Sequence, residues 1–209
     1  MATSLDSIFQ LAIEKNNPEA VKFLLEYTVV DPSINNTAIT TAVKNGFLGI
    51  VKVLLTDGRI NPAFNDNYIL SLAIDKNYLE IVKLLLDDPL VDPSDNHGAA
   101  LILAVKTDKL STVSLLLADA RVDPTAQNNR AIKIAVEQNN VEMATLLYKD
   151  ARVVTMLDSN HVLRNKVIQF IAIKPPVIIL SKEAILTSII TQMEQLLKAM
   201  KDYLSLPSE

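Results

Sequence analysis

The sequence contains no cysteine and no tryptophan, and its 209 residues include only four glycines. The absence of cysteine excludes disulfide frameworks, thiolate metal sites and thiol nucleophiles together. It also fits a reducing compartment, so we expect a cytoplasmic protein. With so few glycines, tight turns must use other residues that tolerate a positive φ angle, chiefly asparagine, aspartate and histidine.

Signals for secretion, membrane insertion and polyanion binding are also missing. Residues Met1–Gln10 lack a basic stretch followed by an apolar core, so no secretory signal peptide is expected. The most apolar region, Val167–Leu180, is interrupted by Lys174, Pro175 and Pro176 and is too short to span a bilayer. The formal net charge of −4 is mild and gives no attraction for a polyanion. We therefore expect a protein that binds neither nucleic acid nor membrane.

What the sequence does contain is a repeat of about 31 residues. An alanine recurs at intervals of 30, 31, 31 and 31 residues. These anchor alanines are Ala12, Ala42, Ala73, Ala104 and Ala135. An apolar residue precedes each anchor by three positions, and a dense apolar run such as Leu84-Leu85-Leu86 follows it. Agreement of five phases at many positions identifies an internal repeat.

Each unit reads as helix, turn, helix and extended loop. In the second unit, Ala38–Lys44 predicts a short first helix, Asn45-Gly46 ends it, and Leu48–Leu55 has its apolar residues on one helical side. Helices this short are marginally stable alone. They must therefore be stabilised by packing against neighbouring units, as in a solenoid.

The loop after each second helix repeats as well. Asp or Asn followed by Pro occurs as Asp31-Pro32, Asn61-Pro62, Asp92-Pro93 and Asp123-Pro124. The Asp or Asn side chain can accept backbone N–H groups in an Asx-type turn, and the proline stops a helix from continuing. A few positions later the chain is expected to turn back through a positive φ angle. The residues predicted there are Asn35, Asp66, His97 and Asn128.

Over roughly residues 3–153 this repeat resembles the ankyrin repeat. The segment Gly46–Leu55 is close to the family's usual second-helix signature. Phrases such as Tyr68–Ala73 keep the leucine and alanine of the Thr-Pro-Leu-His-x-Ala opening but lose its proline and histidine. Each loop is also about two residues shorter than usual. In this the chain resembles the Asp-Pro, Asn-rich arrays of amoebae, giant viruses and amoeba-associated bacteria.

The resemblance implies an all-α fold, an ankyrin-type helix-turn-helix solenoid of five repeats with a C-terminal helical cap. It also implies protein binding through the concave face without a cofactor. Carried over by position, that face has the following candidate residues: Asn36, Lys44, Asn45, Phe64, Asn67, Tyr68, Asp75, Lys76, Lys106, Asn129, Arg130 and Glu137. Tyr68 and Arg130 belong to types enriched at binding hot spots, and Phe64 is apolar near a loop tip. The alternative for each is an ordinary solvated residue.

The patterns required for catalysis are missing. No Gly-rich loop is present to hold a phosphate, and no Gly-x-Ser-x-Gly elbow occurs. The two histidines, His97 and His161, lack the spacing of metal ligands. We expect His97 in a tight turn and His161 in the first turn of a helix, both with structural roles. The sequence therefore predicts no enzyme, no metal site and no cofactor.

The repeat ends after the fifth unit, so we divide the chain into a solenoid over residues 1–153 and a C-terminal helical region over residues 154–209. Ser159-Asn160 can cap a helix that reaches about Ile173. A longer helix with a sustained apolar stripe is expected over Ser181–Leu204. This helix either caps the array or docks a partner or a second copy, which leaves monomer and homodimer both open.

The prediction is a non-catalytic protein–protein interaction module, with a host-directed effector or scaffold as its setting by analogy. Its partner protein is not identified by the sequence. One alternative is an adaptor, in which the repeats select a target and the C-terminal helices recruit a second complex such as a ubiquitin ligase. Another is an oligomer formed through the helix at Ser181–Leu204.

Overall fold

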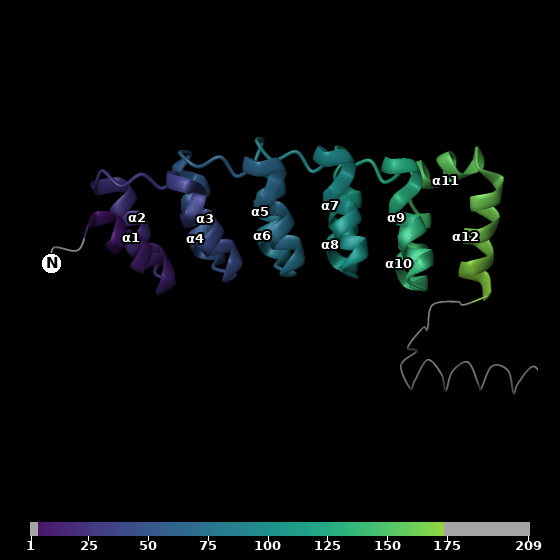
Figure 1. Ribbon diagram of the computed structural model, residues 1–209, viewed down its shortest axis with the longest axis horizontal. Helices are drawn as coiled ribbons and strands as arrows, with labels where there is room; N and C mark the ends of the chain where they lie inside the picture. The colour runs from purple at the N-terminus through teal and green to yellow at the C-terminus, as the bar shows by residue number, and fades with distance from the viewer. Residues whose placement is uncertain (1–3, 174–209) are drawn as a thin grey trace, which may run out of the picture. The chain divides into compact units, whose positions relative to one another are not determined.

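The computed structural model describes residues 4–173, which lie within one compact unit, Met1–Lys174. These residues are helical and include no strand. The helices are α1 (Leu5–Glu14), α2 (Pro18–Tyr27), η1 (Ile34–Asn36), α3 (Thr37–Lys44), α4 (Leu48–Asp57), α5 (Phe64–Asp75), α6 (Leu79–Leu86), α7 (Asp95–Lys106), α8 (Leu110–Ala118), α9 (Ala126–Glu137), α10 (Val141–Tyr148), α11 (Ala151–Asp158) and α12 (His161–Ile173). The helices α1 to α10 form five pairs that stand side by side in chain order (Figure 1). The predicted all-α solenoid of helix-turn-helix repeats is confirmed.

Neighbouring pairs pack like helix against like helix. The first helices α1, α3, α5, α7 and α9 contact one another in order, and so do the second helices α2, α4, α6 and α8. The five anchor alanines are all buried. Because their side chains are small, they allow close approach at the same place in each pair. The short helices thus share one continuous core.

All five first helices end in the same way. The second residue after each helix has a left-handed conformation, with φ between 50° and 72°. These residues are Asn16, Gly46, Asn77, Asp108 and Asn139. The N–H of the next residue donates to the carbonyl of the anchor alanine at 2.8–3.0 Å, which is a Schellman ending. The sequence predicted only the Asn45-Gly46 ending, although asparagine or aspartate recurs at the equivalent position in the other units.

The predicted Asx turns are confirmed at all four Asp-Pro or Asn-Pro loops. The Oδ1 atoms of Asp31, Asn61, Asp92 and Asp123 each accept a hydrogen bond from the N–H two residues later, at 2.8–3.0 Å. Asp66, His97 and Asn128 have φ angles of 56°, 56° and 59°. Each is the middle of three successive left-handed residues, and regular helix begins only after them. In the loop before the second pair, Asn36 is left-handed, with φ of 51°, and the positive φ angle expected at the preceding Asn35 stays a prediction.

Two more helices follow the fifth pair. Helices α11 and α12 pack on α10 and on each other. As predicted, α12 begins after Asn160, whose Oδ1 accepts a hydrogen bond from the N–H of Leu163 at 3.1 Å. Helix α11 was not predicted, and it spans the proposed boundary between residues 153 and 154. The predicted helix at Ser181–Leu204 lies outside the described residues.

Candidate functional site

Three arginines connect neighbouring pairs through a motif that we call the Asp-x-Arg clamp. In the fourth pair, Arg121 Nε and Nη2 donate to the Asp119 carboxylate at 3.0 and 2.6 Å. The same guanidinium donates through Nη1 to the Val91 carbonyl at 2.8 Å and through Nη2 to the Leu86 carbonyl at 2.7 Å. Both carbonyls belong to the third pair, so the aspartate orients a guanidinium that joins two repeats.

The same clamp occurs at two other junctions. Arg59, oriented by Asp57, donates to the carbonyls of Val30 and Leu25 in the first pair at 2.9 and 3.2 Å. Arg152, oriented by Asp150, donates to the carbonyls of Val122 and Leu117 in the fourth pair at 2.7 and 3.0 Å. The leucine carbonyls lie near the C-terminal ends of α2, α6 and α8, where carbonyls lack intrahelical partners and carry partial negative charge. A guanidinium therefore supplies these carbonyls with hydrogen-bond donors and with a compensating positive charge.

The clamp changes the acidity of its aspartates. Hydrogen bonds from Arg59, Arg121 and Arg152 hold the pKa of their partner carboxylates below the ordinary value, although burial acts in the opposite direction. The same bonds raise the pKa of each arginine. These aspartates are therefore ionised at neutral pH, and both oxygens of each carboxylate already accept hydrogen bonds from the arginine. They serve the scaffold and do not act as general acids.

The junction between the second and third pairs lacks this clamp. Leu90 stands where the arginine would be, although Asp88 is present two residues earlier. Among the described side chains, no hydrogen bond or ion pair crosses from the second pair to the third. Instead the Tyr78 ring lies so close to Gly46 that a Cβ added there would be 2.8 Å from the ring Cζ. This junction depends on apolar contact.

The structure leaves most of the predicted site residues at the surface. Those that are exposed are Lys44, Asn45, Tyr68, Asp75, Lys76, Lys106, Arg130 and Glu137. Asn36 and Phe64 are half-buried. Apart from Arg130, which lies near the start of α9, the charged members recur at the C-terminal ends of successive first helices, so the repeat places them at equivalent positions. Asp75 forms an ion pair with its neighbour Lys76 at 3.7 Å.

Two of the predicted contact residues are buried and cannot contact a partner. The side chains of Asn67 and Asn129 are only 4% and 1% exposed. Asn67 Nδ2 donates to the Asp92 carbonyl at 2.9 Å and to Asp95 Oδ2 at 2.6 Å. The prediction for these asparagines was wrong because each ends a left-handed turn and is buried there. Asn67 connects its turn to the next loop of the array.

An aromatic pair lies at the start of α5. The rings of Phe64 and Tyr68 have centroids 6.0 Å apart and planes tilted by 55°. The intervening left-handed turn brings Phe64 back beside Tyr68, and Leu72 follows Tyr68 by one helical turn. The prediction missed Leu72 and the half-buried Ile102 and Leu103 on α7, which packs on α5. The signal for Leu72 and Leu103 was an apolar residue just before the anchor alanine, which recurs in four of the five units.

We use the name first-helix surface for these apolar residues together with the exposed charges around them. Its apolar part is Phe64, Tyr68, Leu72, Ile102 and Leu103. Its charged part is Lys44, Asp75, Lys76, Lys106, Arg130 and Glu137. The first helices thus carry partly exposed apolar residues together with exposed charges of both signs. That composition suits a protein partner better than a polyanion.

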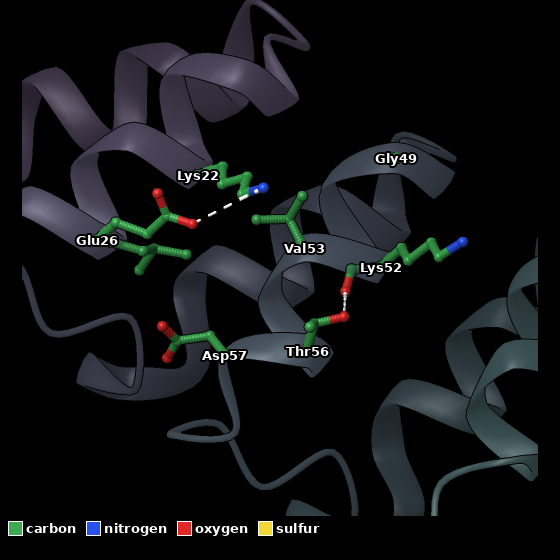
Figure 2. A pocket seen from close by; sticks show the side chains of 8 residues that line it. Lys22, Glu26, Gly49, Lys52, Val53, Thr56 and Asp57 are labelled. Carbon is green, nitrogen blue, oxygen red and sulfur yellow. Dashed lines mark hydrogen bonds and ion pairs between the residues drawn. The ribbon is translucent and has the colours of Figure 1, made fainter.

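A separate hollow of about 340 Å³ lies between the second helices α2 and α4 (Figure 2). Leu25 and Val53 supply apolar lining, while Lys22 and Glu26 form an ion pair at 3.8 Å on its rim. The hollow arises at Gly49, because other units have glutamate or serine at the equivalent position. It therefore reflects a missing side chain, with no set of reactive groups around it.

The described residues contain no cluster of three His, Cys, Asp or Glu side chains that could hold a metal ion. His97 and His161 are both exposed, in a left-handed turn and at the start of α12 respectively. The helices in this part of the chain include none long and apolar enough to cross a membrane.

Comparison with known families agrees with this geometry. The family model described as Ankyrin repeats (3 copies) matches residues 9–97 and, in a second match, residues 70–156. Together the two matches cover well over half of the chain. A search among curated proteins finds no match.

Proposed function

Because the chain belongs to the ankyrin-repeat family, whose arrays are protein–protein interaction modules, we propose that a partner protein docks on its first-helix surface. The proposal assigns a non-catalytic binding role to the array. The concave face expected of an ankyrin array is formed by the same first helices. No cofactor is required for this role.

The contact between exposed Tyr68 and half-buried Phe64 is the observation that carries the proposal. Tyr68 is 44% exposed and contacts a half-buried Phe64, so a large ring is already held in place before a partner binds. A fixed aromatic side chain loses little conformational entropy on binding and buries a large apolar area. Exposed Arg130 has no ion pair among the described residues and can contact an acidic group on the partner.

The setting and domain roles belong to the same proposal. We assign partner binding to the solenoid of residues 1–153 and capping to the region of residues 154–209, with a host-directed scaffold or effector in the cytoplasm as the setting. Resemblance to the arrays of amoeba-associated organisms supports that setting. The adaptor and the dimer through Ser181–Leu204 concern a segment outside the described residues.

Quantitative affinity capture tests the proposed surface. The full-length chain would be compared with a Tyr68→Ala, Arg130→Ala double variant, and captured proteins would be measured by mass spectrometry. We expect specific partners to fall by roughly tenfold or more, as for loss of hot-spot residues. Lys83→Ala is the matched control, because this exposed residue lies on α6, away from the first helices.

Two results would distinguish the rival functions. Unchanged capture by a folded double variant would reject the first-helix surface as the binding site. A chain cut after Lys174 tests the adaptor, since this cut leaves α11 and α12 intact, whereas a cut at residue 153 would divide α11. Retention of every partner would support the array alone, and loss of one class would support the adaptor.

A further inference from the structure

The first pair exposes a side that later pairs bury. Phe23, Tyr27 and Val29 are 59%, 71% and 91% exposed. The positions equivalent to Phe23 in later pairs are half-buried and pack on the core: Val53, Leu84, Leu115 and Leu146. Ile8 is also exposed, whereas its equivalents Ala38, Ile69, Ala100 and Ala131 are all buried. The described residues thus leave one stacking side of α1 and α2 uncovered.

This side of the first pair is more apolar than the equivalent sides of the later pairs. Tyr27 and Val29 occupy the positions that hold Asp and Arg in the three clamps, such as Asp57 and Arg59. A repeat end that faces water is expected to carry polar residues. Here a polar pair is replaced by an aromatic and an aliphatic residue at two highly exposed positions. The substitution favours burial against another protein surface.

Helix α2 carries two parallel stripes of side chains, one aromatic and one charged. The rings of Phe23 and Tyr27 have centroids 5.0 Å apart and form one aromatic surface. In the adjacent stripe, Lys22 and Glu26 form an exposed ion pair whose closest N–O distance is 3.8 Å. In each stripe the two residues are four positions apart, so they lie about one helical turn from each other on the same side of the helix. An exposed pair at this distance contributes little to stability and is free to exchange partners.

We infer that this side of the first pair binds a second copy of the chain, with the two α2 helices antiparallel about a two-fold axis. In that arrangement Phe23 of one copy faces Tyr27 of the other, and Lys22 faces Glu26. A helix with opposite charges four residues apart complements itself only when its partner runs antiparallel. The apolar and charged stripes therefore satisfy the same symmetry, as an isologous interface requires.

Charge reversal in the full-length chain tests this interface. We expect a wild-type dimer by sedimentation equilibrium, with a dissociation constant on the order of 10 µM for so small an interface. Lys22→Glu and Glu26→Lys should each weaken it about tenfold or more, because each brings like charges together. The double reversal should restore the dimer. An equimolar mixture of the two single variants should form a heterodimer.

Matched variants separate this interface from others. Lys83→Glu changes the residue on α6 that is equivalent to Lys22 and should leave the dimer unchanged. Phe23→Ser should abolish the dimer while the helical circular dichroism is retained. A monomeric wild-type chain at about 100 µM would overturn the inference. A dimer that survives both Phe23→Ser and Lys22→Glu would overturn it too, since its interface would lie elsewhere.

Discussion

The junction between the third and fourth pairs and the junction between the second and third pairs are built differently. At the first of these, Arg121 joins the repeats through two carbonyl hydrogen bonds and its own carboxylate partner. At the second, Leu90 replaces the arginine and the Tyr78 ring packs on Gly46. The same repeat geometry is therefore reached by a polar device in one place and by an apolar contact in another.

A second polar contact uses the same repeat positions as the contact between Tyr78 and Gly46. Asn140 of the fifth pair donates through Nδ2 to Asp108 Oδ1 of the fourth pair at 2.6 Å. Tyr78 and Gly46 occupy these same two positions in the third and second pairs. Stacking thus fixes which positions meet, while their chemistry is free to vary from one junction to the next. A junction without a clamp depends more heavily on close packing.

The largest expected effect is at the apolar junction. Gly46 has φ of +72°, and an added Cβ would meet the Tyr78 ring. We expect Gly46→Ala to lower the free energy of unfolding by about 2–3 kcal/mol, from backbone strain and overpacking together. Gly58→Ala is the control, since Gly58 has φ of +77° and no atom within 4 Å of the added Cβ. Its expected loss is about 1 kcal/mol in urea unfolding.

Equal losses of unfolding free energy in Gly46→Ala and Gly58→Ala would show that the Tyr78 ring can move aside without destabilising the fold. The junction would then not depend on that contact.

Removal of a clamp is expected to have the next largest effect. Arg121→Met keeps the aliphatic stem but leaves the Leu86 and Val91 carbonyls without the guanidinium. We expect a loss of about 1–2 kcal/mol, since the side chain is 39% exposed and solvent partly replaces it. Leu90→Met changes the equivalent position of the third pair and should alter stability by less than about 0.5 kcal/mol. A similar small change for Arg121→Met would contradict a stabilising role.

A clamp can also be added where it is missing. Asp88 Oδ1 accepts the Leu90 N–H at 2.9 Å, as Asp119 Oδ1 accepts the Arg121 N–H at 2.9 Å, so the backbone is already suitable. Leu90→Arg should raise the free energy of unfolding by up to about 1 kcal/mol. Leu90→Lys should gain less, because an ammonium lacks the planar fork. No difference between the two variants would mean that no clamp had formed.

The smallest expected effect is the pH dependence of the clamps. The pKa of Asp119 is lower in the folded chain than its ordinary value, chiefly because of the Arg121 hydrogen bonds. Its contribution is therefore present above the unfolded pKa, near 4, and is lost as pH falls through the folded pKa. The stability difference between wild type and Arg121→Met should shrink as the pH falls below about 5, by less than about 1 kcal/mol. A difference independent of pH would exclude the ion pair as its source.

Much of the array was visible in the sequence because the five units can be compared with one another. The anchor alanines and the Asp-Pro loops recur in phase, and both have the predicted roles. The clamp was missed although Asp57-Gly58-Arg59 and Asp119-Ala120-Arg121 are also in phase. Its acceptors are backbone carbonyls 29 to 35 residues earlier, and any residue type supplies a carbonyl.

For the proposed site, the sequence predicted the position of each residue along the repeat but not the direction of its side chain. Sequence placed Asn67 and Tyr68 next to each other at a turn exit, yet one is buried and the other exposed. Three successive left-handed residues decide which way each side chain points, and no local pattern showed that the turn contains three. The aromatic neighbour of Tyr68 likewise required the turn that brings Phe64 back to it.

The Schellman endings determine how such a chain can change its length. Each first helix closes on the carbonyl of its own anchor alanine, so that closing hydrogen bond depends on no other unit. Duplication or loss of a whole unit would leave every first-helix ending intact and would change the contacts at only one junction. Variation in steps of about 31 residues is therefore tolerated, and the reach of the array along a target grows in the same steps.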